Sequence, residues 1–156
     1  MKTYTFSSGQ LLPISIQTAW DFFSSAKNLS RITPPEMRFK IINDFEDDGI
    51  YENMLIDYTV RPLFGIPLNW QTIITRVNEP FQFTDEQKKG PYKKWKHEHT
   101  FIEKENGTFI RDVVTYALPF GFLGRIAHFL FVRKKLNQIF EFRRKTLEDL
   151  FPLPPE

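Results

Sequence analysis

The sequence has 156 residues, enough for one domain with a substantial hydrophobic core. Its formal net charge of +2 gives no strong field to attract nucleic acid, and the lack of cysteine excludes disulfides, thiolate nucleophiles and zinc–thiolate sites. Aromatic residues make up 16% of the chain, with 17 Phe, which favours a core or a cavity walled by rings.

The N-terminal stretch MKTYTFSSGQ lacks the apolar segment of a signal peptide. No run approaches the roughly 20 apolar residues that a membrane-spanning helix needs. The chain also has no internal repeat and no low-complexity linker, so residues 1–156 are expected to form a single domain. We therefore expect a cytoplasmic protein without a transmembrane segment.

A strand is expected first, from Tyr4 to Leu12, and a short helix should follow it. Ser15 is a candidate N-cap for that helix. A further helical turn over Asn28–Ile32 ends at Thr33-Pro34-Pro35, because a residue before proline avoids helical conformations. Helical spacing predicts the buried face of the first helix, which consists of Ile16, Ala19, Trp20 and Phe23.

Six further strands, separated by turn signals, are expected between Phe39 and Leu118. The turn signals include Asp47-Asp48-Gly49 and Asn106-Gly107. Short connections of this kind predict an antiparallel meander that joins the first strand in one sheet. The expected strands are Phe39–Phe45, Ile50–Arg61, Leu68–Val77, Phe81–Gln87, Lys93–Glu103 and Thr108–Leu118.

After Phe120-Gly121 the pattern predicts a helix of roughly thirty residues that covers the sheet. The segment FGFLGRIAHFLFVRKK, in which rings and leucines precede a basic cluster, could instead lie in a membrane interface. We favour the sheet-covering helix, with its lysines and arginines in solvent. Its expected apolar stripe consists of Phe122, Ile126, Phe129, Leu136, Ile139, Phe140, Leu147 and Leu150.

The stretch WKHEHTF places two of the three histidines on one strand, and alternation decides which way they point. Residues two apart in a strand share a face, and Lys94, Lys96 and Glu98 must face water. The inner face should therefore carry Trp95, His97, His99 and Phe101. By the same alternation, the preceding strand should point Phe81, Phe83, Asp85 and Gln87 inward. The following strand should point Asp112 and Tyr116 inward.

The hairpin at Asn106-Gly107 determines which of these residues meet. A two-residue loop at these positions places His99 opposite Val114, whereas a four-residue loop places it opposite Asp112. Either register leaves Asp112 within direct or diagonal reach of His99.

Several hypotheses account for so many polar groups at inward positions. With Asp85 or Asp112, the histidines could hold zinc or iron. His99 and Asp112 could form a general base, or Asp112, Gln87 and ordered water could satisfy both histidines. We favour polar anchors in a pocket for a small apolar ligand, with no metal and no cofactor.

Three stretches, AWDFFSSAKNLSRITPP, FTDEQKKGPYKKWKHEHTF and YALPFG, together with the order of elements, resemble the SRPBCC superfamily. These are the START-related, birch-allergen-like helix-grip proteins, and the chain is similar to small bacterial members described as ligand-binding or polyketide-cyclase-like. The resemblance implies an α+β fold in which a curved seven-stranded antiparallel sheet, with two short helices after strand 1, grips a long C-terminal helix.

The resemblance further implies a deep cavity between the sheet and this helix. The expected function is binding of a small hydrophobic or amphipathic molecule, oriented by polar groups around His97 and His99. One alternative is a cyclase- or dehydratase-like enzyme that uses His99 and Asp112 as its base. Another is a module that contacts a protein or membrane through the basic terminal helix. The expected cavity residues are Met54, Tyr58, Trp70, Asp85, Gln87, Trp95, His97, His99, Phe101, Asp112, Tyr116 and Phe129.

Overall fold

The computed structural model describes residues 1–45, 49–62 and 64–156. None of the helices in these ranges is long and apolar enough to cross a membrane. In chain order the elements are β1 (Tyr4–Leu12), α1 (Ile16–Phe23), η1 (Ala26–Ile32), η2 (Pro35–Met37), β2 (Lys40–Ile41), β3 (Leu55–Val60), β4 (Leu68–Asn78), β5 (Gln82–Lys89), β6 (Lys94–Lys104), β7 (Gly107–Ala117), α2 (Gly121–Ala127), η3 (His128–Val132) and α3 (Arg133–Leu150).

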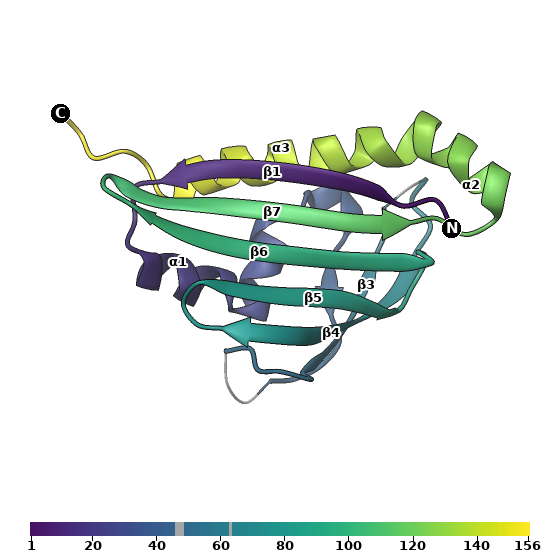
Figure 1. Cartoon of the computed structure of the whole chain (residues 1–156), viewed down its shortest axis with the longest axis horizontal. Helices are drawn as coiled ribbons and strands as arrows, with labels where there is room; N and C mark the ends of the chain where they lie inside the picture. The colour runs from purple at the N-terminus through teal and green to yellow at the C-terminus, as the bar shows by residue number, and fades with distance from the viewer. Residues whose placement is uncertain (46–48, 63) are drawn as a thin grey trace.

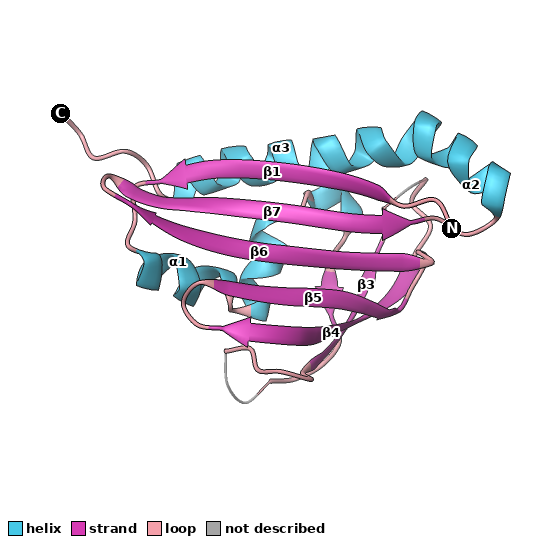
Figure 2. Ribbon diagram, in the orientation of Figure 1, coloured by secondary structure: helices cyan, strands magenta, loops and turns pink. Residues whose placement is uncertain are grey.

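Seven strands of the described chain form one curved antiparallel sheet, in the order β1-β7-β6-β5-β4-β3-β2. In Figure 1 the helix α3 runs along the sheet from the end occupied by α2. Figure 2 shows α1 at the opposite end of the molecule from α2. The α+β helix-grip architecture is therefore confirmed.

The first helix begins as its sequence predicts. The hydroxyl oxygen of Ser15 accepts a hydrogen bond from the Thr18 backbone N–H, which satisfies one of the donors left free at a helix start. Ala19 and Trp20 are buried, and the Trp20 ring packs edge-on against Phe83 and Phe101. This helix therefore closes one end of the sheet with a packed aromatic core.

The strands expected over Phe39–Phe45 and Ile50–Arg61 are much shorter in the structure, as β2 and β3. Asn43 bonds the Asp57 backbone N–H and carboxylate through its side chain and thus replaces strand pairing there. Residues before β3 turn instead of extending, since Asn53 has φ 69°. The turn predicted at Asp47-Asp48 lies outside the described residues.

The β6–β7 hairpin turns one residue earlier than expected. Lys104 pairs with Gly107, so the two loop residues are Glu105 and Asn106. Gly107 belongs to the strand with φ +152°, and a Cβ there would lie 2.1 Å from the Leu12 carbonyl oxygen. In this register His99 faces Asp112, which was one of the two expected pairings.

The C-terminal helix is interrupted, and this changes which of its residues face the sheet. The segment η3 is a π-helix, which contains more residues per turn than an α-helix. Along α3 the buried residues are Leu136, Phe140, Arg143 and Leu147. Because of the extra residue in η3, the side chains that face the sheet before η3 lie one position away from those that an unbroken α-helix would present. They are Gly124 and His128.

The first part of the expected apolar stripe is therefore wrong. Phe122 and Phe129 are 67% and 84% exposed, and Ile126 is exposed as well. A continuous α-helix would have turned these side chains toward the sheet. The extra residue in η3 turns them into solvent instead.

Candidate functional site

A cavity of about 460 Å³ lies between the inner face of the sheet, the short helices after β1 and the helix α3. This volume is within the range of small-molecule sites in proteins. Aromatic and aliphatic side chains form most of its wall. Those from the sheet include Ile56, Tyr58, Val60, Trp70, Ile74, Phe83 and Trp95, and those from the helices include Phe22, Leu29, Ile32, Met37, Leu136, Ile139 and Phe140.

Four groups with ionisable side chains, Asp85, His97, His99 and Arg143, form a polar part of the same wall. Alternation along β6 carries both histidines inward, where they are 6% and 7% exposed. On the other face, Lys96 and Glu98 form an ion pair of 3.1 Å at the surface. The inward orientation of the two histidines follows from this alternation.

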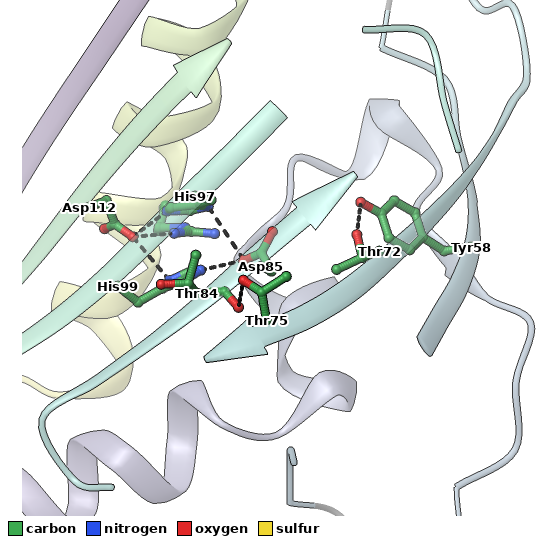
Figure 3. Close-up of polar contacts among 9 residues, drawn as sticks. Tyr58, Thr72, Thr75, Thr84, Asp85, His97, His99 and Asp112 are labelled. Atoms are coloured by element: carbon green, nitrogen blue, oxygen red, sulfur yellow. Dashed lines mark hydrogen bonds and ion pairs between the residues drawn. The ribbon is translucent and has the colours of Figure 1, made fainter. Parts of the chain in front are cut away.

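The two histidines lie between two carboxylates (Figure 3). Nε2 of His97 is 2.7 Å from Oδ1 of Asp112, and Nε2 of His99 is 2.6 Å from Oδ2 of Asp85. The second nitrogens lie farther away, with His99 Nδ1 3.3 Å from Asp112 and His97 Nδ1 4.0 Å from Asp85. Arg143 places Nη1 3.3 Å from Asp112. We call these five residues the polar cluster.

Burial and charge act against each other on the two acids of the polar cluster. Burial raises the pKa of Asp112, but hydrogen bonds from His97 and His99 and the charge of Arg143 hold the pKa well below its ordinary value. Burial also raises the pKa of Asp85, and the hydrogen bond from His99 with the nearby positive charges lowers it overall. Both carboxylates are therefore ionised at neutral pH.

The pKa values of the two adjacent histidines shift in opposite directions, although their rings stack with centroids 3.7 Å apart. Burial lowers the pKa of His99, but its hydrogen bonds to Asp112 and Asp85 outweigh burial and raise the pKa. Burial and the neighbouring charge of His99 lower the pKa of His97. A protonated His99 and Arg143 then balance the two carboxylates, and His97 stays neutral.

In the neutral ring of His97, Nε2 carries the proton that it donates to Asp112, which leaves the lone pair on Nδ1. A protonated His99 donates from both nitrogens. Ligand atoms of Asp85, His97 and His99 also lie within 4.8 Å of one another, which is close enough to hold a metal ion. The proton on His99 already supplies the charge compensation that a cation would provide.

Six of the twelve expected cavity residues line the cavity: Tyr58, Trp70, Asp85, Trp95, His97 and His99. The remaining six lie elsewhere. Met54 and Phe101 are 2% exposed within the packed core, and Asp112 lies behind the histidines. Phe129 points into solvent because of η3.

Gln87 and Tyr116 were expected beside the histidines but have other partners. The Gln87 side chain bonds the backbone N–H and carbonyl of Tyr92 and closes the β5–β6 turn, where these groups have no strand neighbour. The Tyr116 hydroxyl lies 2.8 Å from His128 Nε2, and the His128 ring stacks on Tyr4. Phe81, expected to face inward, is 52% exposed at the turn before β5.

Arg143 was not among the predicted site residues, although the chain contains a signal for it. Arg143 is 7% exposed, lies over the Phe140 ring and contacts Asp112. Its position between Phe140 and Leu147 places it on the apolar stripe of α3, where a charged residue needs a buried partner. That signal is visible in the spacing alone.

Two hydrogen-bond donors on the cavity wall have no partner within the described part of the chain. They are Nε1 of Trp70 and Nε of Arg143, and both side chains are more than nine-tenths buried. A buried donor without an acceptor costs about 1 to 3 kcal/mol. Each donor belongs to a residue that lines the cavity, and a small shift of its side chain would bring it to an acceptor atom there.

Comparisons with solved structures place this geometry in a known architecture. A START superfamily protein from Mycobacterium smegmatis matches with a TM-score of 0.66 and 14% identity, over 94% of this chain and 96% of the other. A norcoclaurine synthase mutant from Thalictrum flavum, in complex with a transition state analogue, matches with a TM-score of 0.66 and 15% identity, over 96% of each chain.

The di-domain ARO/CYC protein BexL of the BE-7585A biosynthetic pathway matches with a TM-score of 0.72 and 15% identity. The match covers 98% of this chain and 51% of BexL. This chain has the helix-grip fold. No protein-family model matches its sequence, and no curated protein does. At such identities the helix-grip likeness concerns the fold alone, so function has to be argued from the cavity and the polar cluster.

Proposed function

We propose that this protein binds a small, mostly apolar molecule that carries a hydrogen-bond acceptor, such as a carbonyl or carboxylate oxygen. The ligand lies in the cavity, and the free donors of Trp70 and Arg143 bind its acceptor atom, beside His97 and His99. The observation that carries the proposal is the pair of buried, unpartnered donors, Trp70 Nε1 and Arg143 Nε, in residues of a mostly apolar wall.

The chemistry of the wall supports this choice of ligand. Binding sites for small molecules are mostly apolar, with a few polar groups that fix orientation. The polar cluster is balanced in charge without a ligand, so its net charge does not select the ligand. The two free donors instead favour an oxygen atom that accepts hydrogen bonds and whose carrier is otherwise apolar.

A matched set of probes tests the proposal. We would titrate naphthalene, 2-acetylnaphthalene and 1-naphthoic acid into the protein and follow tryptophan fluorescence. We expect the two oxygen-bearing probes to bind at least about fivefold more tightly than naphthalene, since one hydrogen bond to a buried donor is worth about 1 kcal/mol or more. Native mass spectrometry of protein purified from its host should also detect a bound molecule.

The Trp70→Phe variant removes the donor and keeps an aromatic ring, so it should reduce the preference for the oxygen-bearing probes. Trp95→Phe is the matched control, because Trp95 lines the same cavity but has no buried, unpartnered donor. Equal affinities for the three probes, or repeated absence of any captured molecule, would count decisively against the proposal.

A second candidate function is acid–base catalysis, and the geometry of His97 favours it. Neutral His97 is oriented by Asp112 through Nε2 and has a lone pair on Nδ1, beside a protonated His99. Neighbouring groups with pKa values shifted apart are typical of acid–base pairs. Asp112 is nearer to His97 than to His99, so His97 replaces His99 as the candidate base.

Incubation of the co-purified ligand with the protein separates catalysis from binding. The enzyme hypothesis predicts a product in the mass spectrum with the native protein and none with His97→Gln, while both proteins still capture the ligand. Recovery of unchanged ligand after long incubation would leave binding alone.

A further inference from the structure

The outer face of α2 and η3 carries a row of exposed apolar side chains. Among them Phe120, Leu123 and Phe129 are 82%, 68% and 84% exposed. Such a cluster on a monomer marks an interaction surface or a membrane contact. We call this surface the apolar ridge, and it consists of Phe120, Phe122, Leu123, Ile126, Phe129 and Leu130.

The apolar ridge adjoins the edge of the cavity. Phe131 follows it directly, and its ring lies 5.6 Å from that of Phe64 in the loop between β3 and β4. Phe64 and Ile66 are 78% and 57% exposed and also line the cavity, together with Val132 at the end of η3. The exposed apolar surface is therefore continuous with one edge of the cavity.

The chain segment that carries the apolar ridge is basic. From residue 113 to residue 140 the sequence contains four basic residues, Arg125, Arg133, Lys134 and Lys135, and no aspartate or glutamate. Arg125 lies over the Phe122 ring, and Arg133 and Lys134 are exposed. Protruding rings beside basic side chains are typical of helices that lie in the interface of an anionic bilayer.

We propose that α2 and η3 dock on an anionic lipid bilayer, with the rings of the apolar ridge among the headgroups and the adjoining edge of the cavity toward the lipids. Charge complementarity favours lipid over a second copy of this chain. A symmetric dimer through this face would bring Arg125, Arg133 and Lys134 of both copies together, whereas phosphate headgroups neutralise them.

Co-sedimentation with vesicles tests the docking. One set of vesicles contains phosphatidylcholine alone, and in the other about one third of the lipid is phosphatidylglycerol. We expect the protein to sediment with the anionic vesicles and much less with the neutral ones. Because exposed charges are screened by salt, ~1 M salt should weaken the binding severalfold.

Two variants separate the apolar and electrostatic contributions. Phe122→Ser with Phe129→Ser, and Arg133→Glu with Lys134→Glu, should each weaken vesicle binding roughly tenfold or more. Phe81→Ser is the matched control, because Phe81 is also exposed but lies in the turn before β5, at the other end of the sheet from α2 (Figure 1). The control should bind vesicles like the native protein.

The same variants should bind the naphthalene probes normally, which shows that they are folded and keeps this proposal separate from ligand binding. Failure of the native protein to bind anionic vesicles, or equal losses in the ridge and control variants, would overturn it. So would a concentration-dependent dimer, measured by light scattering without lipid, that the Phe122→Ser and Phe129→Ser changes abolish.

Discussion

Replacement of Asp112 by asparagine should destabilise the protein severely, although it keeps the shape of the side chain. Asp112 is 5% exposed. Its Oδ1 lies 2.7 Å from a ring nitrogen of His97 and 3.3 Å from side-chain nitrogens of His99 and Arg143. Removing it leaves the buried guanidinium of Arg143 with no carboxylate in contact among the described residues. Breaking a buried charge pair in this way costs about 3 to 5 kcal/mol, a large part of a typical domain's stability.

Urea unfolding followed by circular dichroism measures this loss in the free energy of unfolding. Asp21→Asn is the control, because Asp21 is exposed and its carboxylate accepts a hydrogen bond from the exposed Gln17 side chain, so its change should stay within about 0.5 kcal/mol. Adding Arg143→Met to Asp112→Asn removes the stranded charge and should recover about 1 kcal/mol or more. A loss below about 1 kcal/mol for Asp112→Asn, or strictly additive effects of the two changes, would refute the reasoning.

Three further predictions concern pH, backbone and metal. Because the folded pKa of Asp112 lies well below the ordinary 3.8, the stability that it contributes is complete above that pH and is lost as the pH falls through the folded pKa. The difference in unfolding free energy between native protein and Asp112→Asn should therefore shrink as the pH falls below 3.8, and a difference that does not change between pH 3.8 and pH 2 would contradict this. Gly107→Ala should cost at least ~2 kcal/mol in urea unfolding, because its φ is +152° and the new Cβ would meet the Leu12 carbonyl, whereas Gly49→Ala, which meets nothing within 4 Å, should be nearly neutral. Zinc should leave the Tm unchanged, because the proton on His99 and Arg143 already balance the carboxylates, and a Tm that rises with zinc concentration would show that Asp85, His97 and His99 hold the ion instead.

Patterns of local origin predicted most of the fold. Alternation along β6 placed His97 and His99 on the buried face because charged neighbours at every second position had to reach water. The short turn of the following hairpin allowed only registers in which Asp112 lies opposite or diagonal to His99. Both inferences depend on residues that are close in sequence or paired by a short turn, where backbone geometry leaves few choices.

The cavity residues were harder to predict, because alternation separates the faces of a strand but not the core from the cavity on one face. Phe101 and His99 both point inward from β6. Phe101 lies under α1, where Trp20 and Phe23 cover it, whereas His99 lies beyond that helix and meets the cavity. That difference depends on where a distant helix packs.

The predicted apolar stripe of the C-terminal helix was partly wrong for another reason. A periodic pattern assumes a constant number of residues per turn, and η3 breaks that assumption in the middle of the helix. Phe129 and Ile126 fit the apolar stripe well in an unbroken α-helix. No glycine, proline, asparagine or aspartate within residues 125–136 signals the change.

The π-turn in η3 also fixes how α2 is rotated about the helix axis relative to α3. One residue corresponds to about 100° of rotation in an α-helix. Deleting a single residue there would leave α3 packed against the sheet and swing the rings of α2 from the outside of the molecule toward its interior. The length of the helix alone, without any change of side-chain type, can thus decide whether the rim of this cavity is apolar or polar.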